Sequence, residues 1–135
     1  MNLFNFFTPK SQTFYLLSSS TLRQALEKFD YYKFTVISLI DSDGKFVSTV
    51  SEGDILRYIK NVLHFDLETA ESVKLSEIEK YRQYKPLNIS SPIEEAFQLS
   101  LDQNFIPLID DRGMYIGILK RKTIIEYLIN QNKKN

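Results

Sequence analysis

Two short polar stretches of the chain stand where an apolar strand pattern gives way to a helical one. The first is Ser51-Glu52-Gly53-Asp54, after the apolar residues 46–50, and the second is Lys120-Arg121-Lys122-Thr123, after residues 115–119. A helix N-terminus offers unpaired backbone N–H groups and a partial positive charge, which suit phosphate. A carboxylate beside it can accept both hydroxyls of a ribose. The chemistry available at these two corners is therefore the binding of a phosphorylated sugar.

Each corner also has a purely structural interpretation. Ser51 and Asp54 have the spacing of a helix capping box, with Asp in place of the usual Glu or Gln. The cations of the second corner each lose roughly 0.3–1 kcal/mol against the helix dipole, and a bound anion would reverse that sign. Alternatively, their long side chains extend into water, where screening makes the cost small. Arg121 and Lys122 cannot both point the same way, so we expect only some of the three cations to contribute.

Composition excludes several classes of protein. The 135 residues suit one compact domain or two small halves, and 17 basic residues balance 17 acidic ones, unlike a nonspecific nucleic-acid binder. The absence of cysteine removes disulfides, thiolate nucleophiles and zinc–thiolate sites. No apolar run is long enough to cross a bilayer, and the first residues lack the features of a signal peptide. We expect a cytoplasmic protein without a membrane partner.

The first half predicts the order strand, helix, strand, strand, helix. The expected strands are 13–17, 36–40 and 46–50. One helix is expected after residues 18–21, and a second is expected to begin at Asp54. Apolar residues at helical spacing define the two buried helix faces: Leu22, Ala25, Leu26 and Phe29, then Ile55, Leu56, Ile59 and Leu63.

The second half repeats this plan. Strands are expected at 86–89, 105–109 and 115–119, and the last helix over 123–128, followed by a polar tail. A helix start is predicted by Ser91 as N-cap, Pro92 at the first position and Glu94 closing a capping box. The buried face of this helix is expected to contain Ala96, Phe97 and Leu101.

The remaining segments have simpler predictions. Residues 64–85 connect the halves and are expected to carry a short helix around Leu75 and Ile78. The phenylalanines of the lead-in 1–12 are expected to cover an edge of the core or a partner. The predicted division is thus a lead-in 1–12, a first repeat 13–63, a connection 64–85, a second repeat 86–131 and a tail 132–135.

The repeat is visible in the residues. Asp41-Ser42-Asp43-Gly44 aligns with Asp110-Asp111-Arg112-Gly113, and Tyr58 aligns with Tyr127. Ala25 aligns with Ala96 after a small shift. Duplication of this kind indicates two units that cannot bury their apolar faces alone and pack on each other.

This duplicated pattern, with Ser-x-x-Asp after the third strand, resembles the CBS domain pair, or Bateman module, of the stand-alone bacterial type. The matching residues run from 39 to 56 and from 106 to 125. The resemblance implies an α+β (α/β) fold of tandem CBS repeats, each β-α-β-β-α, packed as a pseudo-twofold pair. It implies a ligand in the cleft between the halves: AMP, ADP, ATP, S-adenosylmethionine or cyclic di-AMP.

The resemblance also implies roles for single residues. Asp54 would hold the ribose, Ser51 the phosphate, and the backbone around Thr35, Val36 and Ile37 would face the adenine. The second corner departs from the family, because Lys120 and Thr123 replace its Ser/Thr and Asp, and Ser38 replaces a common proline that Pro107 keeps. The run Lys120-Arg121-Lys122 resembles the corner of bacterial pairs of which a subset bind cyclic di-AMP.

The expected function is regulatory sensing of an AMP, ADP or ATP type of ligand, with one principal ligand per chain. The sugar would lie at Asp54 and the phosphate toward the basic corner. The alternatives are a cyclic di-AMP receptor, and an interaction or dimerisation module with an empty cleft. CBS pairs commonly associate through their helices, so we expect a homodimer that signals to a regulated protein not identified by the sequence.

The sequence offers no sign of catalysis or of a metal centre. No Ser–His–Asp set, Gly-rich phosphate loop or recognisable carboxylate pair is present, so we expect no enzyme. His64 lacks further ligands at suitable spacing. The aspartates Asp41 and Asp110 belong to expected hairpin turns, where Asp is preferred for local reasons.

Overall fold

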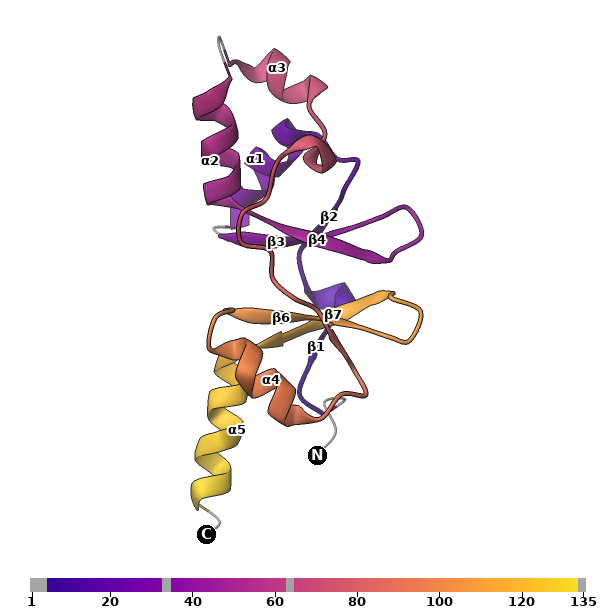
Figure 1. Ribbon diagram of the computed structural model, residues 1–135, viewed down its shortest axis with the longest axis vertical. Coiled ribbons are helices and arrows are strands. Elements are labelled where there is room, and N and C mark those ends of the chain that lie inside the picture. Colours follow the sequence, from indigo (N-terminus) through magenta and orange to yellow (C-terminus); the bar gives the residue numbers. More distant parts are fainter. Residues whose placement is uncertain (1–4, 33–34, 63–64, 134–135) are drawn as a thin grey trace. The chain divides into compact units, whose positions relative to one another are not determined.

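A computed structural model describes residues 5–32, 35–62 and 65–133 of the chain (Figure 1). The chain divides into two compact units, Phe14–Gln83 and a second unit made of Met1–Thr13 with Tyr84–Asn135. Each unit combines one β-sheet with helices, so the predicted mixed α and β fold is confirmed.

The unit Phe14–Gln83 is built on a three-stranded sheet in the order β2-β3-β4, in which β2 runs parallel to β3 and β4 antiparallel to it. Its helices lie on one side of this sheet (Figure 1). The elements are β2 (Tyr15–Leu17), α1 (Leu22–Tyr32), β3 (Val36–Ile40), β4 (Phe46–Ser51) and α2 (Glu52–Asn61). The core joins sheet to helices through Ile37, Leu39 and Val50 from the strands and Leu22, Ala25 and Ile55 from the helices.

The connection after α2 belongs to this unit. It contains α3 (Leu67–Ser72) and the 3-10 turn η3 (Leu75–Glu77), so the expected short helix is confirmed and is preceded by a second one. Ala70, Val73, Leu75 and Ile78 are buried in the same core as the sheet. This segment therefore completes the fold of the unit instead of forming a bare linker.

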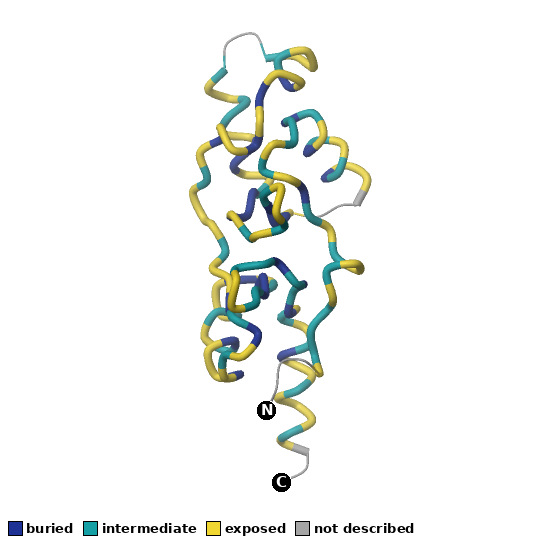
Figure 2. The backbone as a smooth tube through the Cα atoms, turned by 90° about the vertical axis from the view of Figure 1, so that its right-hand side faces the viewer, coloured by how far each residue is buried: buried dark blue, intermediate teal, exposed yellow. Residues whose placement is uncertain are grey.

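The other unit is built on a four-stranded sheet in the order β1-β7-β6-β5. Its elements are β1 (Thr8–Pro9), the 3-10 turn η2 (Lys10–Gln12), β5 (Leu87–Asn88), α4 (Ile93–Ser100), β6 (Phe105–Ile109), β7 (Tyr115–Lys120) and α5 (Arg121–Lys133). Its core resembles the first in composition and contains Leu87, Ile93, Ala96, Ile106, Leu108, Leu119 and Ile124. Figure 2 follows the burial of these residues along the backbone.

The lead-in segment extends this second sheet. Thr8 and Pro9 pair antiparallel with Ile118 and Gly117 of β7, and Phe6 and Phe7 pack against the core. Of the two alternatives for these phenylalanines, the core or a partner, Phe6 and Phe7 therefore follow the first, and Phe4 lies outside the described residues. Gly117 makes the approach possible, because its φ of 153° is one that side chains rarely adopt and an added Cβ would lie 2.1 Å from the Thr8 carbonyl oxygen.

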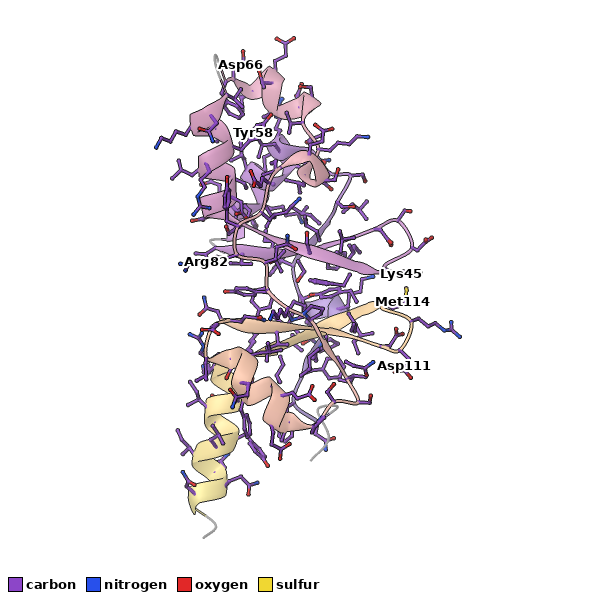
Figure 3. All side chains as sticks on the ribbon, viewed as in Figure 1. Lys45, Tyr58, Asp66, Arg82, Asp111 and Met114 are labelled. Carbon is purple, nitrogen blue, oxygen red and sulfur yellow. The ribbon has the colours of Figure 1, made fainter. Side chains whose placement is uncertain are left out.

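The two hairpin turns share one set of hydrogen bonds. Asp41 Oδ1 accepts from the backbone N–H groups of Asp43 and Lys45, both at 2.9 Å. In the second turn Asp110 Oδ1 accepts in the same way from Arg112 and Met114. Figure 3 labels Lys45 and Met114, with which these turns end. Asp is thus needed for turn geometry, as its position in the sequence predicts.

The start of α4 differs from the prediction. Pro92 is the N-cap, with an extended backbone (ψ 148°), and no side chain caps the helix. The prediction of a capping box between Ser91 and Glu94 is therefore wrong, because Ser91 lies one residue before the N-cap. Leu101 was expected in the buried face, but it follows the last residue of α4 and is 75% exposed.

Two helices have different bounds from those expected. α2 begins at Glu52, two residues before Asp54, because Ser51 caps it. α5 runs from Arg121 to Lys133 and so takes in residues assigned to the polar tail. Leu63 and His64, assigned to the end of α2 and to the connection, lie outside the described residues.

Gly117→Ala should lower the free energy of unfolding by about 2 kcal/mol or more, because a Cβ cannot be accommodated beside the β1 backbone. Urea denaturation measures the change. Gly53→Ala is the matched control: its added Cβ would meet nothing closer than 3.6 Å, so stability should stay equal or rise by up to about 1 kcal/mol. Equal stability of the Gly117 variant would contradict the proposed role of this close approach.

Candidate functional site

The first corner lies where β3 begins and β4 ends. Val36 pairs with Ser51, and the Glu52 N–H donates to the Thr35 carbonyl oxygen at 2.9 Å. β2 starts at Tyr15, opposite Ser38, so no residue of β2 lies beside the first two residues of β3. The structure therefore gathers the predicted residues Thr35, Val36, Ser51 and Asp54 at one edge of the sheet. The side chain of Ile37 lies in the core, which leaves only its backbone for the predicted contact.

The capping box predicted at this corner is present. Ser51 Oγ accepts a hydrogen bond from the Asp54 N–H at 3.0 Å, and Asp54 Oδ2 accepts one from the Ser51 N–H at 2.9 Å. These bonds satisfy two backbone donors at the start of α2. The structural interpretation of Ser51 and Asp54 is therefore confirmed, and their ligand-binding role stays a prediction.

The second oxygen of Asp54 is also engaged. Asp54 Oδ1 accepts a hydrogen bond from the Tyr81 N–H at 3.0 Å and lies 3.6 Å from Arg57 Nη1. The Asp54 side chain is only 1% exposed. A ribose can reach this carboxylate only if Tyr81 and Arg57 move, which couples any such binding to the segment that carries Tyr81.

The side chains of Arg57 and Tyr81 contact each other beside Asp54. The Arg57 guanidinium lies 4.3 Å from the centre of the Tyr81 ring, within the range of a cation–π interaction. The Tyr81 hydroxyl donates to Glu79 Oε2 at 3.1 Å, and this bond raises the pKa of Tyr81. Sequence reasoning missed Arg57, although its position three residues after Asp54 on one helix was a signal for the pair.

A hollow of about 200 Å³ adjoins these side chains. Lys80 stands between Glu79 and Tyr81, two residues that line this hollow. The Lys80 ammonium donates to the Leu75 carbonyl oxygen at 2.6 Å, and burial lowers the pKa of Lys80. The hollow is lined by Asp54, Arg57, Tyr58, Asn61, Val62, Glu79 and Tyr81. Its size suits water or a small polar group more than a whole nucleotide.

The second corner uses the same backbone contact as the first. The Arg121 N–H donates to the Asn104 carbonyl oxygen at 3.0 Å, and Lys120 pairs with Phe105. The Arg121 side chain donates from Nε to the Ser100 carbonyl oxygen at 2.8 Å, which ties α5 to the end of α4. Arg121 is thus engaged in the fold, and the prediction that only some of the three cations can meet a ligand fits this geometry.

The two remaining cations, Lys120 and Lys122, are exposed at the start of α5. The first turn of α5 contains no acidic residue, whereas that of α2 contains Glu52 and Asp54. The two corners therefore carry opposite charge on the same backbone scaffold. Thr123, half-buried in the first turn of α5, stands where α2 has Asp54.

Within the described ranges, one buried side-chain oxygen lacks a hydrogen-bond partner. Ser38 is 1% exposed, and no group in the described part of the chain hydrogen-bonds its Oγ. An unpaired buried hydroxyl costs about 1–3 kcal/mol. Ser38 stands at the register position that Pro107 occupies in the second repeat, so this cost arises where the two repeats differ.

Other kinds of site find little support in the described residues. Over 5–32, 35–62 and 65–133, no group of three or more His, Asp or Glu side chains could hold a metal ion. His64 lies outside those residues. No helix in the same part of the chain is long and apolar enough to cross a membrane.

The sequence matches the CBS domain family over residues 9–61 and again over residues 78–130. These two segments cover most of the chain, and their order agrees with the duplicated hydrogen bonds of the corners and turns. The chain therefore belongs to the CBS domain family and carries a tandem pair of the domain. No curated protein sequence matches it.

Solved structures of low sequence identity share this fold. CbpB in complex with c-di-AMP is 18% identical, with 99% of this chain and 88% of that one covered and a TM-score of 0.87. A CBS domain protein from Streptococcus pneumoniae TIGR4 is 20% identical, with coverage of 94% and 86% and a TM-score of 0.82. CBSX2 in complex with AMP is 23% identical, with coverage of 97% and 98% and a TM-score of 0.74.

Asp54→Ala should destabilise the protein by about 2 kcal/mol, because it leaves the N–H groups of Ser51, in the capping box of α2, and of Tyr81 without their acceptor. Chemical denaturation gives the value. Glu52→Ala is the control, since Glu52 is an exposed acid in the same helical turn, and its removal should cost less than 0.5 kcal/mol. Similar losses for the two variants would show that the buried carboxylate does not tie the corner together.

Proposed function

We propose that the protein is a regulatory module that senses an adenine nucleotide of the AMP, ADP or ATP type. The observation that carries the proposal is the start of α5, where Lys120 and Lys122 are exposed and no acid is present in the first turn. The comparisons add that relatives in fold, CbpB and CBSX2, have been solved with c-di-AMP and with AMP.

The electrostatics of α5 favour an anionic ligand. Each cation at a helix N-terminus loses roughly 0.3–1 kcal/mol against the dipole. A phosphate placed there gains from the cations and from the unpaired backbone N–H groups at once. The first corner has the opposite character, with a carboxylate that suits ribose hydroxyls. In the unit Phe14–Gln83 we assign ribose binding to Asp54 and the adenine contact to the backbone of residues 35–37. In the other unit we assign phosphate binding to Lys120 and Lys122.

Binding of a sugar at Asp54 would have a consequence for the rest of the chain. The ribose would replace the Tyr81 N–H and Arg57 at Oδ1, and so release the segment around Tyr81. This segment ends at Gln83, where the first unit ends. Its release would be the signal that a partner protein reads, and its size is limited by the difference in ligand affinity between the two arrangements.

Two other functions each have an observation in their favour. The basic corner favours a receptor for cyclic di-AMP, whose two phosphates would use both lysines. The engagement of Asp54 within the fold favours an interaction or dimerisation module that binds no nucleotide. In each of the three cases the protein acts by binding and not by catalysis.

The double variant Lys120→Ala, Lys122→Ala should bind AMP, ATP or cyclic di-AMP about tenfold more weakly, a loss of about 1.4 kcal/mol. The affinity of the wild type should itself fall as salt is raised, because the contacts are exposed. Isothermal titration measures the affinity and the number of ligands per chain. Lys60→Ala removes an exposed lysine from the last turn of α2 and should leave binding unchanged. A wild type that binds none of the three ligands would exclude the proposal.

We also propose that the protein forms a homodimer through α2 and α5. Leu56 of α2 was expected in the buried face of that helix, but it is 67% exposed. The exposed apolar residues of α5 lie at helical spacing, at positions 125, 128 and 129. α5 is mostly exposed along its length in Figure 2. Apolar stripes of this kind on an exposed helix favour burial against another helix.

Ile125→Glu together with Ile129→Glu should turn the dimer into a monomer, because two charges would enter the apolar stripe. Light scattering on the separated species gives the mass. Leu101→Glu is the control, since Leu101 is 75% exposed at the end of α4 and outside the stripe, and it should leave the dimer intact. A wild type that is monomeric at high concentration would exclude this assembly.

A further inference from the structure

The sheet of the unit Phe14–Gln83 has one apolar face and one that contains hydroxyls. Ile37, Leu39 and Val50 face the core shared with α1 and α2. Successive side chains in a strand alternate between faces, and directly opposed residues share a face. Ser38, which pairs with Thr49, therefore lies on the face away from those helices. Both residues are 1% exposed.

The second repeat shows what the fold requires at this place. Pro107 of β6 pairs with Ile118 of β7, in the same register as Ser38 and Thr49. Pro107 is also fully buried. The same position in the same type of sheet is thus filled without a hydroxyl. The fold therefore does not require a hydroxyl at the position of Ser38.

Ser38 is the member of this pair whose hydroxyl is unsatisfied in the described structure. We infer that Ser38 is a specificity residue, whose hydroxyl hydrogen-bonds the base of the bound nucleotide. This inference rests on the proposed function, and it adds a side chain to a contact otherwise assigned to backbone alone. A serine hydroxyl can both donate and accept, so it can pair with a ring nitrogen or with an amino group of a base.

The position along β3 fits a contact to the base. Val36 is opposite Ser51 at the corner, and Ser38 lies two residues further along on the same face. Two residues of a strand span about 7 Å. A nucleoside with its ribose at the corner and its base directed along β3 would bring the edge of the base to the Ser38 hydroxyl.

Burial makes this contact selective. Because Ser38 is only 1% exposed, a ligand reaches its hydroxyl only when neighbouring side chains move. A ligand without a polar group at that point would leave the hydroxyl unpaired and would gain nothing from the movement. Ser38 thus separates ligands that carry a base from those that carry only sugar and phosphate.

The experiment compares AMP with ribose 5-phosphate, by isothermal titration and thermal shift, in the wild type and in Ser38→Ala. We expect AMP to bind the variant about three- to tenfold more weakly, the effect of one lost hydrogen bond. Binding of ribose 5-phosphate should be the same in both proteins. Without ligand, the melting temperature of the variant should equal or exceed that of the wild type, because an unpaired hydroxyl has been removed.

Ser48→Ala is the matched control. Ser48 lies on β4 of the same sheet and pairs with Leu39, so it belongs to the face toward the helices and should not affect AMP. Unchanged AMP affinity in Ser38→Ala, an equal loss for both ligands, or a lower melting temperature without ligand would overturn the inference. In the first two cases the wild type still binds AMP, so the proposed function survives. A wild type that binds neither ligand removes both.

Discussion

The Asp54 carboxylate is the group on which the first corner depends. A buried charge is costly unless its oxygens are paired. Here Oδ2 accepts a hydrogen bond from the Ser51 N–H at the start of α2. Oδ1 accepts one from the Tyr81 N–H, 27 residues away in sequence, and lies near Arg57. A single side chain therefore fixes where β4 ends, where α2 begins and how the connecting segment lies against the helix.

The two corners show which parts of this arrangement the family fold demands. The bond from Glu52 to Thr35 in the first repeat recurs as the bond from Arg121 to Asn104 in the second. It joins backbone atoms, so the side chains at the same positions are free to differ. In the first repeat one of these side chains is the capping-box acid Asp54, and in the second repeat they include the cations Lys120 and Lys122. This is why the family can be recognised from sequence while the ligand cannot: the scaffold is set by backbone, and the chemistry by a few side chains.

Local patterns predicted local structure well. Strands 36–40 and 105–109, the aspartate turns and the capping box of Ser51 depend on residues close in sequence, and each is present. The predicted start of α4 was wrong by one residue, because the extended backbone of Pro92 makes Pro92, and not Ser91, the N-cap. The pairing of β1 with β7 and the bond from Tyr81 to Asp54 join distant segments, so no periodicity could reveal them.

The contribution of each residue to ligand affinity should follow from its bonding before the ligand arrives. At Asp54 a ribose would exchange existing hydrogen bonds for new ones, so the net gain is small and the main result is movement of Tyr81. At Lys120 and Lys122 a phosphate would relieve an unfavourable charge, and at Ser38 a base would satisfy a hydroxyl that has no partner among residues 5–32, 35–62 and 65–133. If the proposed function holds, affinity should therefore come from the basic corner and from Ser38, and the carboxylate would couple binding to the conformation of the chain. On this argument, Ser51 and Asp54 are poor guides to which ligand binds, although they are the most recognisable part of the motif.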